Sequence, residues 1–195
     1  MTLVGICGGS CSGKSTIVDG LKSSISDLTV IHFDDFFVGK EKFEGLNVTN
    51  WEDPHLYRFD DFEEALSSLK QDRPIEIEAN SRESRHEGLK TRILKPNRYV
   101  VVEGFLIFYT ENTRRFFDKK VYLDIPEMEI IKRRYERMDK GGGKYSDEYI
   151  KKTLIEEHKK NVVPQKQYAD LIIDATKPIC EIIDSVTAYI NNDQN

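Results

Sequence analysis

Residues 8–15, GGSCSGKS, form a glycine-rich motif that constrains this chain more than any other feature. They fit the pattern G-x-x-x-x-G-K-S, which ends here in Lys14 and Ser15. An apolar run of strand length (LVGIC, 3–7) precedes the motif, and apolar residues at helical spacing follow it. Strand, loop and helix in this order are the context in which such a loop cradles phosphate groups with its backbone N–H groups. The sequence therefore predicts a nucleoside triphosphate site.

The motif also predicts roles within that site. Lys14 is expected to reach the outer phosphates, and the Ser15 hydroxyl to ligate Mg²⁺. The start of the following helix adds partial positive charge at the same place. A glycine- and serine-rich turn that fits the pattern by chance is the alternative, and the flanking segments argue against it. The candidate ATP-binding residues of this segment are Gly8, Gly9, Ser10, Cys11, Ser12, Gly13, Lys14, Ser15 and Thr16.

Composition narrows the class of protein. The 195 residues, 38% hydrophobic and 32% charged, suit a soluble globular domain with a real core. The net charge of −5 argues against a general nucleic-acid binder. Cys7, Cys11 and Cys180 form no paired framework and no zinc motif, which favours a reducing compartment. With no signal peptide and no apolar run of membrane length, we expect a cytoplasmic protein that binds neither nucleic acid nor membrane.

Strand-like and helical patterns alternate along the chain. Strands are expected at 3–7, 28–33, 99–102, 120–124 and 171–174, and helices at 58–70, from 126 onward, at 147–160 and at 179–190. This alternation predicts an α/β fold with a five-stranded parallel sheet flanked by helices. Residues 74–78 and 91–94 predict a small two-stranded excursion beside it.

Carboxylates follow two of the predicted strands, at the sheet edge where ligands bind in such folds. Asp34 and Asp35 follow the second strand, and either could orient an acceptor hydroxyl and take its proton during phosphoryl transfer. A turn or a helix cap is the alternative for both. Glu103 ends the central strand, where phosphate-loop proteins commonly hold Mg²⁺ through an acidic residue. The alternative is that Glu103, which precedes a glycine, is an ordinary turn residue.

Three arginines, Arg133, Arg134 and Arg137, precede the glycine triplet 141–143. Arginines beside a glycine hinge suit a lid that closes over a triphosphate and stabilises the transferring charge. The alternative is a solvated helix face whose arginines pair with nearby carboxylates.

The remaining candidates are the tryptophan with its neighbouring glutamate, and the histidines. Trp51, the only tryptophan, could stack on a base, and the adjacent Glu52 could hold a ribose diol. Anchoring a long loop is the more ordinary role for such a tryptophan. The histidines show no ligand spacing and are expected to be structural or exposed; they are His32, His55, His86 and His158.

Taken in order, these motifs resemble the uridine kinase family of P-loop nucleoside kinases, which includes the nicotinamide riboside kinases. The resemblance covers most of the chain. It rests on GGSCSGKS (8–15), DDFF (34–37), NWEDP (50–54), SR (84–85), VEGFLIF (102–108), the three arginines and PQKQYAD (164–170). It implies ATP-dependent, Mg²⁺-assisted phosphorylation of a ribonucleoside 5′-hydroxyl. We expect one kinase domain over 1–195, with an acceptor-side insertion at about 38–95 and a lid at about 137–147.

The resemblance also assigns residues to roles. Asp34 matches the catalytic aspartate of the family, and Ser15 and Glu103 match its magnesium-side positions. Glu52 stands where the family has a ribose-binding aspartate, so a longer carboxylate is a departure. The resemblance gives catalysis to Asp34, Lys14, Arg133 and Arg137, a further ATP contact to Arg133, and acceptor binding to Asp34, Phe37, Trp51, Glu52, Arg85 and Arg134.

The resemblance does not identify which nucleoside base the protein accepts. Uridine kinases carry a tyrosine and a histidine before the Ser-Arg pair, and residues 78–83 (EANSRE) contain neither. An acidic pocket from Glu52, Glu78 and Glu83 would suit a cationic nicotinamide ring. We expect a uridine/cytidine kinase, with a nicotinamide riboside kinase, a kinase for another small acceptor such as pantothenate or a sugar phosphate, and a nucleotide-switched binding protein as alternatives. The sequence leaves homo-oligomer formation open.

Overall fold

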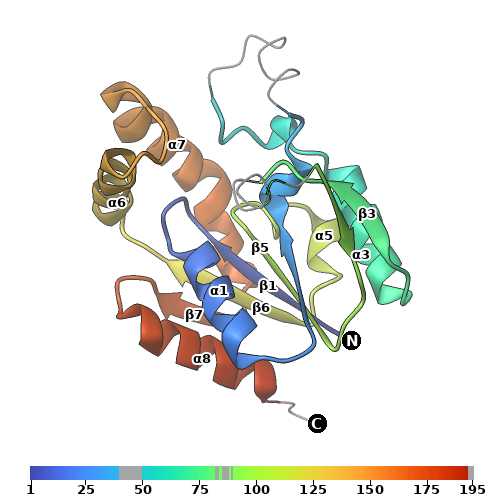
Figure 1. The fold of residues 1–195 in the computed structure, drawn as a ribbon. Helices are drawn as coiled ribbons and strands as arrows, with labels where there is room; N and C mark the ends of the chain where they lie inside the picture. Colours follow the sequence, from blue (N-terminus) through green and yellow to red (C-terminus); the bar gives the residue numbers. More distant parts are fainter. Residues whose placement is uncertain (40–49, 82–83, 85–87, 89, 193–195) are drawn as a thin grey trace.

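The computed structural model describes residues 1–39, 50–81, 84, 88 and 90–192, which form a sheet with helices on both faces (Figure 1). Five parallel strands lie in the order β2-β5-β1-β6-β7. Their bounds are Thr2–Gly8 (β1), Leu28–His32 (β2), Tyr99–Gly104 (β5), Lys119–Asp124 (β6) and Leu171–Asp174 (β7). The predicted α/β fold and its five-stranded parallel sheet are confirmed.

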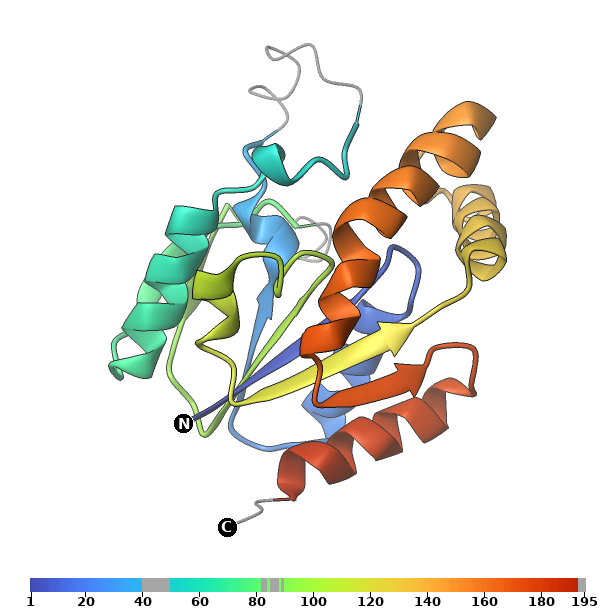
Figure 2. The same cartoon turned by 180° about the vertical axis from the view of Figure 1, so that it is seen from behind.

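Each face of the sheet has its own core. Along β1, Leu3 and Cys7 pack into one core while Val4 and Ile6 pack into the other, because neighbouring side chains of a strand point to opposite faces. In Figure 1, α1 (Lys14–Ser24) and α8 (Ile179–Asn191) lie in front of the sheet. Figure 2 shows α3 (Phe59–Lys70) and α5 (Glu111–Arg114) on the opposite face. All four β1 side chains are fully buried.

Beyond the carboxyl ends of the strands stand two helical segments. The strand β6 leads toward α6 (Glu127–Asp139), as Figure 2 shows. After the glycine triplet come π-helical turns (η3, Tyr149–Thr153), α7 (Leu154–Glu157), further π-helical turns (η4, His158–Val162) and a 3₁₀ segment (η5, Val163–Tyr168). A helix is predicted only to residue 160. The helical path continues to Tyr168 because Pro164, lacking an N–H, is accommodated in the first turn of a tighter segment.

Short elements lie outside the main sheet. The predicted excursion is an antiparallel pair, β3 (Ile75–Glu78) with β4 (Thr91–Leu94). The sequence pattern gives no sign of two 3₁₀ turns, η1 (Phe33–Phe36) and η2 (Pro54–Leu56). The strand β2 ends at His32, one residue earlier than predicted, because the turn η1 begins at Phe33. Asp34 and Asp35 both lie in this turn. Within the part of the chain that the structure describes, no helix is long and apolar enough to span a bilayer.

Gln165 links η5 to the loop after β5. Its Oε1 accepts the Phe108 N–H at 2.8 Å, and its Nε2 donates to the carbonyls of Phe105 and Asn161, both at 2.7 Å. The side chain is buried, with 2% exposed. We expect Gln165→Leu to lower the free energy of unfolding by about 1–3 kcal/mol, because it strands buried backbone groups. Urea denaturation measures the change.

A matched control lies two residues along. Gln167 is exposed and, among the described residues, donates only to the Pro164 carbonyl, so Gln167→Leu should stay within about 0.5 kcal/mol of the parent. Equal losses in the two variants would contradict the linking role of Gln165.

Candidate active site

The loop between β1 and α1 has the backbone of a phosphate cradle. Gly13 (φ 98°) and Cys11 (φ 61°) are left-handed, a conformation that curls the chain back on itself. Gly9 packs closely against His158, since a Cβ at position 9 would lie 2.6 Å from the His158 ring. Burial lowers the pKa of His158, so this ring packs on the loop as a neutral group. The helical segment that carries His158 therefore packs against the phosphate loop and holds it in place.

Lys14 lies against the same loop. Its Nζ donates to the carbonyls of Gly8 and Gly9, both at 2.9 Å. The ammonium group is thus beside the backbone expected to surround phosphate oxygens.

A cavity of about 1360 Å³ opens at the carboxyl ends of the strands. It brings together most of the predicted site residues from segments far apart in sequence. They are Ser10, Cys11, Ser12, Gly13, Lys14, Ser15, Thr16, Asp34, Phe37, Trp51, Glu52, Glu103, Arg133, Arg134 and Arg137. Gly8 and Gly9 belong to the base of the loop and do not line the cavity, and Arg85 lies outside the described residues.

The two neighbouring aspartates face different surroundings. Asp34 is exposed and lines the cavity. Asp35 is completely buried, and its carboxylate accepts from the Ser81 N–H at 2.7 Å, the Ser84 hydroxyl at 3.2 Å and Arg92 Nη1 at 3.1 Å. Its acceptor capacity is used within the fold. Of the two, Asp34 is placed to meet a ligand and Asp35 holds the β3–β4 excursion against η1.

This division predicts a stability effect for Asp35. We expect Asp35→Ala to lower the free energy of unfolding by about 3 kcal/mol, because Arg92 loses its buried partner. Asp61 pairs with Arg58 at the surface, and Asp61→Ala should cost under about 1 kcal/mol. Denaturant titration of both variants tests this, and an unchanged midpoint for Asp35→Ala would refute it.

Glu103 and Ser15 meet at the carboxyl end of β5, which lies beside the middle strand, β1, and is not itself the central strand that the sequence predicted. The Ser15 Oγ lies 3.5 Å from Glu103 Oε1, which also contacts His32 Nδ1 at 2.8 Å. A hydroxyl and a carboxylate beside a phosphate loop are the hard oxygen ligands that Mg²⁺ takes together with substrate phosphates. Among the described residues no cluster of three or more His, Cys, Asp or Glu could hold a metal ion. The hydroxyl and the carboxylate supply two oxygen ligands, which fits a metal whose other ligands come from nucleotide and water.

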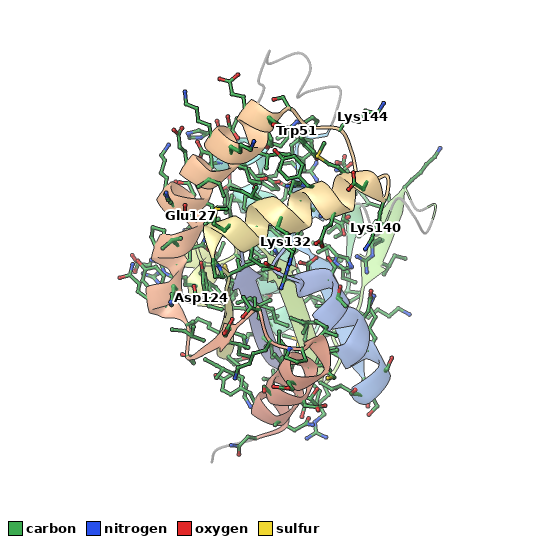
Figure 3. The ribbon with its side chains drawn as sticks, turned by 90° about the vertical axis from the view of Figure 1, so that its left-hand side faces the viewer. Trp51, Asp124, Glu127, Lys132, Lys140 and Lys144 are labelled. Carbon is green, nitrogen blue, oxygen red and sulfur yellow. The ribbon has the colours of Figure 1, made fainter. Side chains whose placement is uncertain are left out.

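Two arginines of α6, Arg133 and Arg134, contact the phosphate loop. Figure 3 looks onto α6, with Glu127 at its start and Lys140 just past its end. Arg133 donates to the Cys11 carbonyl at 3.3 Å and to the Ala175 carbonyl at 2.9 Å. Its Nε also donates to Glu129 at 2.8 Å, so the predicted pairing on the helix surface exists as well.

Arg134 joins three segments. Its guanidinium donates to the Ser10 Oγ at 2.7 Å, lies 3.6 Å from Glu52 Oε1 and sits over the Tyr145 ring at 4.7 Å. Burial raises the pKa of Glu52, and the nearby charges of Arg134 and Lys14 oppose that shift. Glu52, Arg134 and the loop therefore form one connected polar group at the cavity wall.

Aromatic rings also line the cavity. The rings of Phe37 and Trp51 are 5.7 Å apart, Tyr57 meets Phe37 edge-on at 5.7 Å, and Phe105 meets Tyr57 at 5.2 Å. Trp51 is 37% exposed. These rings give the cavity an apolar face that a planar base could stack on.

The predicted acidic pocket is wrong for Glu78. This carboxylate pairs with Arg58 at 2.5 Å and lines a separate hollow of about 400 Å³ between α3 and β3, not the main cavity. Strand alternation is the reason: Ile77 points into the core, so Glu78 turns away from it. Glu83 lies outside the described residues.

Some residues that line the cavity have no role predicted from the sequence, although Phe105 lies within the VEGFLIF motif (102–108). Tyr57, Asn80, Phe105 and Tyr145 line the cavity. The tyrosine and asparagine positions come from segments without helical or strand periodicity, so no pattern could aim their side chains. The buried His32 follows from β2 pairing with β5 in register with Glu103.

Solved structures share this fold. Shikimate kinase from Acinetobacter baumannii in complex with shikimate matches with a TM-score of 0.57 at 15% identity, covering 100% of this chain and 96% of that one. A structure described as a possible uridine kinase from Bacillus stearothermophilus matches with a TM-score of 0.53 at 20% identity, covering 89% and 88%. At these identities the likeness concerns the fold.

Curated relatives are more similar in sequence. Uridine kinase from Borreliella burgdorferi (strain ZS7) is 33% identical over 177 residues, 88% of this chain and 85% of that protein. Uridine kinase from Staphylococcus aureus (strain JH9) is 28% identical over 198 residues, covering 98% and 96%.

The parallel sheet, the phosphate loop and the arginine-bearing helix over it define a P-loop kinase. The sequence profile of the Phosphoribulokinase / Uridine kinase family matches residues 3–179, and the chain belongs to that family. The resemblance drawn from the motifs alone is thereby confirmed.

Proposed function

We propose that this protein transfers the γ-phosphate of ATP to the 5′-hydroxyl of a ribonucleoside, as a uridine kinase does. The observation that carries the proposal is the single cavity that joins the phosphate loop to Asp34 and to the ring-lined wall. The relatives named uridine kinase, which align over most of the chain, support the nucleoside as acceptor.

On the acceptor side, Asp34 orients the 5′-hydroxyl and takes its proton as the new P–O bond forms. Glu52 and Arg134 hold the ribose hydroxyls, since a carboxylate accepts and a guanidinium donates. Phe37 and Trp51 provide the surface for the base. The acceptor-side insertion at about 38–95 belongs to this half of the proposal, as does the acceptor contact that the family resemblance gives to Arg85.

On the donor side, the loop amides and Lys14 bind the β- and γ-phosphates. Arg133, from α6, and Arg137, at the start of the lid at about 137–147, stabilise the charge that spreads over the transferring group. Ser15 and Glu103 would hold Mg²⁺, which neutralises phosphate charge when bound. The protein accelerates the reaction by placing the reacting oxygens in line and excluding water.

An acceptor panel tests the proposal. ADP release from ATP and Mg²⁺ is measured with uridine, cytidine, nicotinamide riboside, adenosine, pantothenate and no acceptor. Turnover with one pyrimidine nucleoside and little without acceptor is the expected result. A preference for nicotinamide riboside would move the assignment to the alternative base. Equal slow hydrolysis in every reaction would refute the kinase assignment and favour a nucleotide-switched binding protein.

A further inference from the structure

The two oxygens of Glu103 differ in their partners. Oε1 contacts His32 Nδ1 at 2.8 Å and lies 3.5 Å from the Ser15 Oγ. No described residue donates a hydrogen bond to Oε2, although Glu103 lines the cavity. One oxygen is therefore tied into the fold, and the other is available on the cavity side.

The fold places the histidine beside this carboxylate. His32 ends β2 and pairs in register with Glu103 on β5, so both side chains leave adjacent strands at one level. The side chains are 3% and 7% exposed, respectively. A carboxylate offers acceptor oxygens, so we assign the hydrogen of this contact to Nδ1. Buried and aligned, the bond restricts rotation of the Glu103 side chain.

We propose that His32 is a positioning residue: its Nδ1–H holds Glu103 Oε1 so that Oε2 faces the magnesium of the bound nucleotide. The inference rests on the proposed function and deepens it. Without the imidazole, Glu103 can rotate toward Ser15 and shorten the 3.5 Å hydrogen bond that Oε1 already accepts from the Ser15 hydroxyl, which draws both metal-side groups away from the metal position. Partners that orient metal-binding carboxylates typically change metal affinity by 10–100-fold when they are lost.

The test uses Mn²⁺ in place of Mg²⁺ because electron paramagnetic resonance reports free Mn²⁺ directly. Mn²⁺ is titrated into the protein–ADP complex of the parent, His32→Leu, His32→Asn and Thr29→Val. Leucine fills the space without a donor, whereas the asparagine amide can place an N–H near the original Nδ1. Thr29→Val removes two other hydrogen bonds of β2, one donated to the Lys95 carbonyl and one accepted from the Asn97 amide, at the end of the strand away from the cavity.

We expect His32→Leu to weaken Mn²⁺ binding about tenfold, with His32→Asn and Thr29→Val close to the parent. ADP affinity measured in EDTA should be the same in all four proteins. Parent-like Mn²⁺ affinity in His32→Leu would overturn the positioning role while leaving the kinase proposal intact. Equal weakening in the leucine and asparagine variants would also overturn it, since then volume and not the N–H matters. Failure of the parent itself to bind ADP and Mn²⁺ would instead count against the proposed function.

Discussion

Asp34→Asn should reduce kcat by about 10²–10⁴-fold and leave ATP affinity unchanged. The amide keeps the shape of the side chain but cannot take the proton of the acceptor hydroxyl. The hydrogen bonds that hold the β3–β4 excursion go to the carboxylate of Asp35, and Asp34 lines the cavity, so the fold should survive the change. Steady-state kinetics gives kcat, and fluorescence titration with a labelled nucleotide gives the affinity.

Asp60→Asn is the matched control, because Asp60 is an exposed carboxylate on α3 that lies outside the cavity lining. Its kcat should equal that of the parent. If Asp34→Asn also kept full turnover, the proton would have to be taken elsewhere, and the role given to Asp34 would be wrong.

Lys14→Ala should lower kcat/KM for ATP by about 10²–10³-fold, because a donor aimed at the transferring charge is lost. The Lys14 Nζ already lies within 2.9 Å of the loop carbonyls that flank the phosphate position. Initial rates at varied ATP concentration measure the effect.

Lys22→Ala is the control for Lys14→Ala, because it removes a different lysine of α1. Lys22 lies on the same helix, is exposed and pairs only with the exposed Asp19 within the described structure. Its kinetics should match the parent. Similar losses in the two variants would indicate a general charge effect and contradict a specific phosphate contact for Lys14.

Periodic patterns explain why much of the fold is predictable. Buried strands such as β5 read as continuous β-branched runs, and α3 shows its apolar face at helical spacing. The phosphate loop is predictable because its chemistry needs particular residues at fixed spacing. The sheet edge then brings Asp34 and Glu103 near that loop, as the strand-end rule expects.

Side-chain direction is what the sequence could not supply. Strand-end spacing alone does not separate Asp34 from Asp35, although the family resemblance favours Asp34; the turn η1 sends one to the cavity and the other into the fold. The His32–Glu103 contact joins residues 71 positions apart through strand pairing, so no local spacing reveals it. Glu78 was assigned to the wrong surface because its strand, β3, had no predicted orientation toward the cavity.

The most direct test compares the best nucleoside of the acceptor panel with its 5′-deoxy analogue, which keeps the base and the ribose diol but lacks the reacting hydroxyl. ADP formation and the phosphorylated product are followed together by mass spectrometry. The account predicts nucleoside 5′-monophosphate in equal amount to ADP from the nucleoside, and only acceptor-free background from the analogue. Equal ADP formation with both compounds, and no monophosphate, would contradict phosphoryl transfer to a 5′-hydroxyl in this cavity.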